Sequence, residues 1–290
     1  MKEKICLVTG ANAGIGEATA RALAKKGAHV VMLCRNLNKA EKSRQRIIQA
    51  TQNDKVDILL ADLASQQQIK EVAYQFSEQY PWLDVLVNNA GVLMGKKRQT
   101  SIDGLEMTFA VNHLASFLLS CLLLDSLKKS SYARLVNVAS EAHRYANLDF
   151  NDLQLEENYS GFKAYCNSKL CNILFTRELH QRLKGVPITA NALHPGTIGS
   201  NFGRYAGGAY KWFFQLAKPF LLSPEKAAET SIYLASGKQA ARYSGEYFIK
   251  KKRVEPTKVA TNAYNAKRLW EISEDLCGVR FLSEKGKLQK

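Results

Sequence analysis

No hydrophobic run in the sequence is long enough to cross a bilayer. The longest, residues 114–124, contains two serines and a cysteine and stops at Asp125. A membrane-spanning helix needs about 20 consecutive apolar residues, so we expect a buried helix here. A strand-like run begins at Ile5 and leaves no room before it for a signal peptide or a membrane anchor. These absences favour a cytoplasmic protein and leave peripheral contact with a membrane open.

Paired cysteines are also missing. The six cysteines form no CxxC pair and no cysteine–histidine cluster with the spacing of zinc ligands, so we expect no metal site. Most fall inside predicted strands and helices, where a free cysteine packs as a small hydrophobic residue. This usage fits a reducing compartment rather than a disulfide framework. The six are Cys6, Cys34, Cys121, Cys166, Cys171 and Cys277.

No Ser-, Pro- or Gly-rich linker divides the chain, and it contains no internal repeat or low-complexity tract. The hydrophobic fraction of 46% is enough to bury a sizeable core. We therefore expect a single domain over residues 1–290.

Acidic residues are few, 26 against 41 basic ones, which gives a formal net charge of +15. Such a charge attracts polyanions of any kind, including a phosphorylated cofactor. The densest basic run, residues 250–253, is interpreted as a solvated turn or strand end. Without a recognisable nucleic-acid-binding motif, we expect no nucleic acid partner.

The sequence does contain apolar, β-branched runs that alternate with amphipathic segments. Near-continuous hydrophobic strands between helices indicate a parallel sheet covered on both faces. With right-handed crossovers, the expected fold class is α/β: a doubly wound, mainly parallel, Rossmann-like sheet. Such sheets bind ligands at the carboxyl ends of their strands. We expect strands at residues 5–9, 29–33, 56–60, 83–87, 133–138, 188–192 and 246–250, and helices at residues 15–25, 37–51, 66–79, 104–128, 161–184 and 224–236.

A glycine-rich stretch follows the first predicted strand and leads directly into a helix. Glycines there let the backbone turn tightly and approach a pyrophosphate, whose charge lies against the helix N-terminus. An ordinary turn is the alternative, but this position between strand and helix favours dinucleotide binding. The candidate residues are Gly10, Asn12, Ala13, Gly14, Ile15 and Gly16.

The second predicted strand is followed by Arg35 and Asn36, with no acidic residue nearby. Folds of this kind that prefer NAD usually place a carboxylate here for the ribose hydroxyls. A guanidinium instead suits a 2′-phosphate through charge-assisted hydrogen bonds. We favour NADP(H) over NAD(H), the alternative being a solvent-exposed arginine without a ligand.

Two further strand ends carry polar residues. Asp62 has two interpretations, an acceptor for an adenine amino group or a cap for the helix that begins near Ser65. Residues 88–91 follow the fourth strand, where asparagines either knit adjacent loops and touch the cofactor ribose or form a plain turn. The candidates for cofactor contact at these ends are Asp62, Leu63, Asn89, Ala90 and Gly91.

Tyr165 and Lys169 lie four residues apart in a strong helical pattern, so they share one helix face. A tyrosine pKa near 10 is too high for efficient acid–base catalysis at neutral pH, and a nearby ammonium favours the phenolate. Ser140 follows the fifth strand and would polarise a substrate carbonyl. A tyrosine–lysine pair alone is common by chance, so the interpretation depends on its order with the other motifs.

In order and spacing, these motifs resemble the short-chain dehydrogenase/reductase family over almost the whole chain. The resemblance implies that Tyr165 is the general acid/base, and that Asn112 holds a water linking Lys169 to solvent. It also implies that Tyr165 and Lys169 contact the bound nucleotide. The implied catalytic tetrad is Asn112, Ser140, Tyr165 and Lys169, and the residues flanking the nicotinamide are Pro195, Gly196, Ile198 and Ser200.

Within that family the chain looks most similar to the retinol dehydrogenase group. Members of that group are typically NADP-dependent and act on retinoids and other lipophilic aldehydes. Many of them have an N-terminal membrane anchor, which we do not expect here, and the chain places Ala139 before Ser140, where serine is common. The similarity rests on residues 103–106, 111–114, 162–166, 174–179 and 193–196.

We therefore predict an NADP(H)-dependent oxidoreductase that moves a hydride between the nicotinamide and a lipophilic carbonyl or alcohol, retinal-like or another bulky aldehyde or ketone. The aromatic segment near 200–222 has three interpretations: a substrate lid or pocket, core packing, or a helix in a membrane surface. The alternatives for function are a non-catalytic NADP-binding sensor or scaffold and a nucleotide-sugar epimerase on the same fold. Relatives pair through helices matching 104–128 and 161–184, so a homo-oligomer stays open.

Overall fold

The computed structural model describes residues 1–196, 222–281 and 288–289. The apolar runs form the predicted strands, with bounds that shift by at most two residues. They are β1 (Ile5–Thr9), β2 (His29–Cys34), β3 (Val56–Leu60), β4 (Val85–Asn88), β5 (Ala133–Val138), β6 (Ile188–His194) and β7 (Tyr247–Ile249).

The strands form one sheet in the order β3-β2-β1-β4-β5-β6-β7-β8. All neighbouring pairs from β3 to β7 are parallel, and β8 (Lys252–Arg253) pairs antiparallel with β7. The order of strand addition reverses between β1 and β4, which makes the crevice at their carboxyl ends the topological switch point. The α/β, doubly wound, mainly parallel fold is confirmed.

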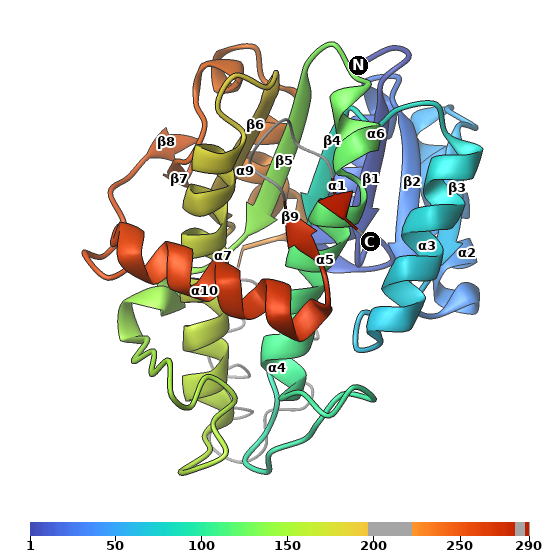
Figure 1. Cartoon of the computed structure of the whole chain (residues 1–290). Helices are drawn as coiled ribbons and strands as arrows, with labels where there is room; N and C mark the ends of the chain where they lie inside the picture. Colours follow the sequence, from blue (N-terminus) through green and yellow to red (C-terminus); the bar gives the residue numbers. More distant parts are fainter. Residues whose placement is uncertain (197–221, 282–287, 290) are drawn as a thin grey trace.

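Helices cover both faces of the sheet (Figure 1). Successive residues of a strand point to opposite faces, so Val30 and Met32 pack in one core and Val31 and Leu33 in the other. The first core is closed by α1 (Gly14–Lys25), α2 (Leu37–Thr51) and α9 (Pro224–Ser236). The second is closed by α3 (Gln66–Gln79), α5 (Ala115–Leu122), α6 (Leu124–Lys128) and α7 (Gly161–Arg182), with α10 (Ala263–Cys277) across α7.

The helical segment predicted near residues 104–128 is confirmed from residue 107 onward, but it is not one regular α-helix. The chain instead forms α4 (Met107–Phe109), a π-helical turn η1 (Ala110–Leu114), α5 and α6. A π-turn admits one extra residue and often occurs at functional sites, and hydrophobic periodicity cannot reveal it. The structure also adds elements that were not predicted: α10, the 3₁₀ turns η2 (Glu141–Tyr145) and η5 (Gln239–Arg242), and the pair β9 (Arg280–Phe281) and β10 (Leu288–Gln289).

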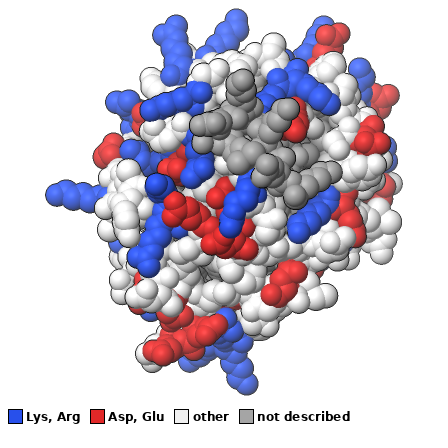
Figure 2. Space-filling view, in the orientation of Figure 1, with Lys and Arg blue, Asp and Glu red and all other residues white. Residues whose placement is uncertain are grey.

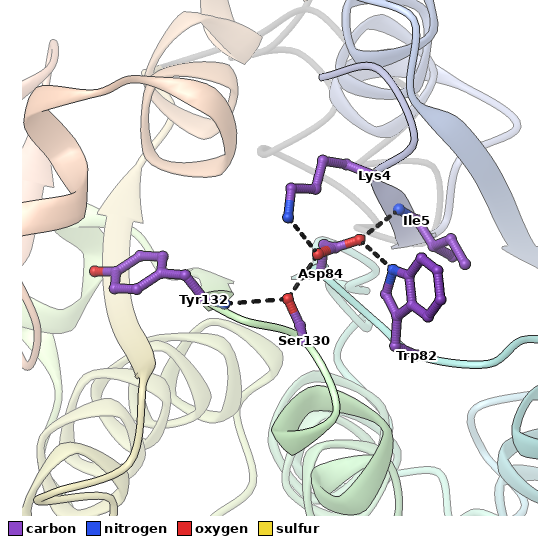
Figure 3. Close-up of polar contacts among 6 residues, drawn as sticks. All are labelled: Lys4, Ile5, Trp82, Asp84, Ser130 and Tyr132. Carbon is purple, nitrogen blue, oxygen red and sulfur yellow. Dashed lines mark hydrogen bonds and ion pairs between the residues drawn. The ribbon is translucent and has the colours of Figure 1, made fainter.

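A buried carboxylate fixes the amino-terminal edge of the sheet. Asp84 is 2% exposed, and Figure 3 shows it at the centre of donors from separate segments. It accepts hydrogen bonds from Lys4 Nζ, the Ile5 backbone N–H and Trp82 Nε1, each at 2.8 Å. Ser130 Oγ donates a fourth at 2.6 Å. The carboxylate therefore joins β1 to the segments that lead into β4 and β5.

Acidic and basic side chains are interspersed on the face of the molecule shown in Figure 2. Lys250 and Lys251 form the exposed turn between β7 and β8, and Lys251 Nζ pairs with Glu229 at 2.8 Å. The interpretation of residues 250–253 as a solvated turn is confirmed.

The six cysteines are free and buried, as predicted. In the part of the chain that the structure describes, no helix is both long and apolar enough to span a membrane. Nor do the described His, Cys, Asp and Glu side chains form a group of three or more that could hold a metal ion.

Candidate active site

The candidate residues borne by strand ends all lie at one edge of the sheet. The glycine loop follows β1, Arg35 follows β2, and Asp62 lies two residues after β3. Asn89 directly follows β4, and Ser140 lies two residues after the end of β5. Because the strands are parallel, these carboxyl ends meet at the switch-point crevice. Lys169 reaches the same edge from α7, where its ammonium contacts the end of β5.

The glycine loop is closed by its own backbone and by the neighbouring strand end. Gly10 and Gly14 have positive φ values of 65° and 56°, which glycine adopts without strain. A Cβ on Gly16 would lie 2.3 Å from the Gly10 carbonyl oxygen and 2.5 Å from Asn89 Nδ2. Asn89 Nδ2 donates to the carbonyl of Thr9 at 2.8 Å. No larger side chain at position 16 is compatible with this packing.

The loops after β1 and β4 are knitted together through Thr9. Its hydroxyl accepts hydrogen bonds from the backbone N–H groups of Asn89 and Ala90, both at 2.9 Å. Asn88 faces inward instead, and its Nδ2 donates to Ser120 and Asn137. For residues 88–91, the expectation that asparagines knit adjacent loops is confirmed, whereas contact with the cofactor ribose stays a prediction.

The N-terminus of α1 lacks a side-chain cap. Its N-cap residue, Ala13, makes no side-chain hydrogen bond to the first turn. The first N–H groups of a helix need acceptors and lie at the positive end of its dipole. The residues present thus fit a dinucleotide diphosphate. The other long helices described are each capped by a side chain, from Asn36, Ser65, Ser160, Ser223 and Asn262.

Arg35 and Asp62 form an ion pair across the ends of β2 and β3, with Nη1 and Oδ2 3.3 Å apart. The Arg35 side chain is 66% exposed, which leaves most of its guanidinium surface open to a ligand. Asp62 Oδ1 accepts from the backbone N–H of Ala64 at 3.0 Å, whereas Ser65 caps α3. The capping interpretation of Asp62 is therefore wrong. Leu63 packs against the core.

Tyr165 and Lys169 share the face of α7 that meets β5. Lys169 Nζ lies 5.6 Å from the centroid of the Tyr165 ring. It donates a hydrogen bond to the Val138 carbonyl at 2.9 Å, and its side chain is buried. A Cβ on Gly91 would lie 3.5 Å from Nζ and 3.3 Å from Asn112 Oδ1. A glycine at position 91 thus lets the backbone approach this ammonium closely.

Burial shifts both pKa values. It raises the pKa of Tyr165 above its ordinary value, and a hydrogen bond with Ser140 partly offsets that shift. Burial also lowers the pKa of Lys169 to about 8. Desolvation of the phenolate is the larger of the two effects on Tyr165, and the expectation that the Lys169 ammonium favours the phenolate stays a prediction. Without bound cofactor, Tyr165 is a phenol and a proton donor.

Ser140 caps the 3₁₀ turn η2, which directly follows β5. Its Oγ accepts from the backbone N–H of Ala142 at 3.1 Å, and its carbonyl accepts from His143 Nδ1 at 2.7 Å. These contacts hold Ser140 beside the Tyr165 hydroxyl, to which it is hydrogen-bonded.

The Asn112 side chain is committed to protein partners. Its Oδ1 accepts from the Val92 backbone N–H at 2.7 Å, and its Nδ2 donates to the Val92 carbonyl and to Ser168 Oγ at 3.0 and 2.9 Å. Both amide hydrogens are used, so a water linked to Lys169 would have to donate to an oxygen of Asn112. The two oxygens are Oδ1 and the main-chain carbonyl, which also accepts from Ser116 Oγ at 3.3 Å.

The residues predicted to flank the nicotinamide are only partly among the described residues. Pro195 and Gly196 follow β6, and Gly196 has a φ of +94°. Ile198 and Ser200 lie outside the described residues, as does the segment near 200–222 except for Leu222. Two further groups have no recognisable sequence signal: the Val138 carbonyl, which is a main-chain group, and Asn172, which shares that acceptor at 3.4 Å.

Comparisons with known proteins show the family of the chain. The profile of the family described as short chain dehydrogenase matches residues 4–208. The chain belongs to that family. It is 43% identical to human retinol dehydrogenase 13 over 282 residues, which cover 95% of this chain and 85% of that protein. It is 41% identical to mouse retinol dehydrogenase 11 over 276 residues, 95% of this chain and 87% of that one.

A solved structure shares the architecture. The crystal structure of an uncharacterised protein from Mycobacterium paratuberculosis superposes with a TM-score of 0.79 at 30% identity, covering 97% of this chain and 96% of that one. The short-chain dehydrogenase is thus an oxidoreductase whose fold binds a nicotinamide cofactor.

Proposed function

We propose that this short-chain dehydrogenase transfers a hydride between NADP(H) and a lipophilic carbonyl or alcohol. The observation that carries the proposal is the position of Tyr165, Lys169 and Ser140 at the switch-point crevice, next to the uncapped N-terminus of α1. A dinucleotide diphosphate at that helix end would lie at the same sheet edge as a proton donor.

The proposed chemistry divides among three side chains. When bound, the nicotinamide supplies a hydride to the carbonyl carbon, or takes one from the alcohol. Tyr165 donates its phenolic proton to the carbonyl oxygen, so that the oxygen becomes a hydroxyl. Ser140 orients that oxygen by a hydrogen bond. Lys169, whose pKa is about 8, is mostly charged at pH 7 and stabilises the phenolate left on Tyr165.

The preference for NADP(H) rests on Arg35. Its exposed guanidinium follows β2, where NAD-preferring folds usually place an acid. Asp62 holds it at the rim of the crevice. A 2′-phosphate can take charge-assisted hydrogen bonds from the faces of Arg35 that Asp62 leaves open.

A lipophilic substrate is supported by an aromatic pair beside the crevice. Phe162 precedes Tyr165 by three residues on α7, and Tyr145 ends the turn that begins after Ser140. Their ring centroids are 6.3 Å apart, and Tyr145 is 73% exposed. Two relatives named as retinol dehydrogenases point to the same substrate class.

Steady-state kinetics test the proposal. Purified protein is assayed with NADPH or NADH against apolar aldehydes and ketones, sugars and small polar ketones. We expect NADPH-dependent reduction of the apolar compounds. Tyr165→Phe should lower kcat by about 100- to 10,000-fold, the range that a general acid contributes. Tyr74→Phe, at an exposed tyrosine on α3, is the matched control and should retain activity.

The same experiment separates the alternatives. Tight cofactor binding without turnover of any carbonyl would favour a sensor or scaffold. Turnover confined to nucleotide sugars would favour an epimerase. Either result would overturn the proposed reaction.

A further inference from the structure

The peptide group between Ser140 and Glu141 is held on both sides by histidine rings. Its carbonyl oxygen, which belongs to Ser140, accepts a hydrogen bond from His143 Nδ1 at 2.7 Å. Its N–H, which belongs to Glu141, donates to His194 Nδ1 at 3.3 Å. His143 lies in η2, whereas His194 ends β6. Two separate elements therefore hold one peptide group close to the end of β5.

The partners of His143 determine its tautomer. The Ser140 carbonyl can only accept, so Nδ1 carries a hydrogen. Nε2 lies 3.4 Å from the main-chain nitrogen of Thr257, whose N–H can only donate, so Nε2 carries none. Tyr247 of β7 packs edge-on against the ring at a centroid distance of 5.2 Å, and burial raises its pKa, so it is a neutral phenol. The buried His143 ring thus joins η2 to the segment that follows β8.

His194 has the opposite tautomer. Because the Glu141 N–H donates to its Nδ1, that nitrogen carries no hydrogen, and the neutral ring has its hydrogen on Nε2. An added proton on His194 would occupy Nδ1 and remove the acceptor of Glu141. An added proton on His143 would occupy Nε2, so that the bond from Nδ1 to Ser140 would remain. Of the two rings, His194 is therefore the one whose charge decides whether the peptide group is held on both sides.

The surroundings keep both rings neutral at pH 7. Burial is the largest effect, and it lowers the pKa of each histidine from 6.5. Among the described residues, Glu141 of η2 raises both values. Arg144 of η2 lowers the pKa of His143, and His143 and Lys250 lower that of His194. Neutral rings are what the two hydrogen bonds to the peptide group require.

The held peptide group lies at the start of the turn that orients the Ser140 hydroxyl. The next N–H along the chain, that of Ala142, donates to Ser140 Oγ at 3.1 Å. The hydroxyl keeps its own hydrogen for another acceptor. Rotation of the Ser140–Glu141 peptide group would displace the Ala142 N–H and, with it, the oxygen that it binds.

We propose that His143 and His194 are positioning residues that fix the Ser140–Glu141 peptide group and thereby the direction of the Ser140 hydroxyl. The inference rests on the proposed function, in which that hydroxyl orients the carbonyl oxygen of the substrate. Both rings act through the main chain, and neither is assigned a contact with substrate or cofactor.

Imidazole ¹⁵N NMR of the wild-type protein tests the two hydrogen bonds without any substrate. The chain has five histidines, and His143→Asn and His194→Asn assign the two signals. At about pH 7 we expect the hydrogen of His143 on Nδ1 and that of His194 on Nε2. The reverse tautomer or a charged ring at either position would overturn the inference. Because this measurement needs no turnover, its failure and that of the proposed function are distinguishable.

Steady-state kcat tests the effect on Ser140. An asparagine places a polar amide atom near the position of Nδ1, whereas a leucine has a similar branched shape and no polar atom. We expect His143→Leu and His194→Leu to lower kcat about fivefold or more, as loss of one hydrogen bond implies. The two asparagine variants should recover most of that loss. Equal kcat values in the leucine and asparagine variants would overturn the inference.

The dependence of kcat on pH separates positioning from a loss of stability. In wild-type protein kcat should fall below pH 6.5, as His194 gains a proton. His194→Asn has no such proton to gain, so this fall should be absent. His29→Leu loses a hydrogen bond with Asp57 at the opposite edge of the sheet and is the matched control, with wild-type kcat and pH profile. An unchanged fall in His194→Asn would contradict the positioning role.

Discussion

The ammonium of Lys169 donates a hydrogen bond to the main-chain carbonyl of Val138 at 2.9 Å. Val138 ends β5, and Ser140 follows two residues later. The contact joins the helix that carries Tyr165 to the strand that leads into Ser140. Helix α7 and strand β5 are therefore locked together where the proposed proton transfer takes place.

Arg35→Leu tests the preference for NADP(H). A charge-assisted hydrogen bond contributes about 1.5–3 kcal/mol, so KM for NADPH should rise about 10- to 100-fold. NADH has no 2′-phosphate, so its KM serves as the internal control and should change by less than about twofold. Steady-state kinetics with both cofactors measure the effect. Equal losses with NADPH and NADH would contradict the assignment of Arg35 to the phosphate.

Asp84→Asn tests whether the buried Asp84 carboxylate stabilises the amino-terminal edge of the sheet. Asp84 accepts four hydrogen bonds and is 2% exposed. An amide there would turn hydrogens toward existing donors, and we expect a loss of about 3 kcal/mol in the free energy of unfolding. Lys4→Met is the control and should cost at most about 1 kcal/mol, because the Lys4 side chain is 40% exposed. Urea unfolding measures the free energy of unfolding of both variants. Similarly small losses in the two would contradict a stabilising role for the Asp84 hydrogen bonds.

His113 is expected to lower the free energy of unfolding as the pH falls. Burial lowers its pKa from 6.5 to about 3 in the folded chain. Between these values the unfolded chain binds the extra proton, so the free energy of unfolding decreases as pH falls, by at most about 1.4 kcal/mol per pH unit. From pH 6.5 to 4.5, wild-type protein should lose about 2–3 kcal/mol more than His113→Gln. Urea unfolding at a series of pH values measures this difference, and parallel curves would contradict it.

Helix α10 covers the helices through which relatives are expected to pair. Trp270 packs edge-on against Phe117 of α5 at 4.9 Å and lies 5.8 Å from Phe175 of α7. Figure 1 shows α10 lying across these helices. We therefore predict a monomer of 32.4 kDa in size-exclusion chromatography with light scattering. A stable dimer cross-linked between α5 or α7 of two copies would contradict this prediction.

Sequence reasoning located the strands and the glycine loop because both depend on local patterns. Apolar runs mark buried parallel strands, and glycines at positions 10, 14 and 16 meet steric needs within a few residues. Helix α10 was not predicted, although Asn262 caps its start. Its buried residues also form one stripe along the helix, which includes Leu269, Trp270, Ser273 and Cys277. That pattern is local and is therefore predictable from the sequence.

Other features have no local signature. The Val138 carbonyl is a main-chain group, so no residue type reveals that it accepts from Lys169. The π-turn interrupts a segment in which nearly every residue is buried, polar ones included, so that no apolar periodicity marks the turn. The raised pKa of Tyr165 comes from burial by the assembled fold, which spacing along one helix cannot report.

Hydride transfer itself tests the central claim most directly. NADPH deuterated at both C4 positions is incubated with wild-type protein and an apolar aldehyde, and the alcohol is analysed by mass spectrometry. We predict one deuterium on the carbinol carbon and its loss in Tyr165→Phe. An alcohol formed without deuterium, or no alcohol with any aldehyde despite bound NADPH, would contradict the account.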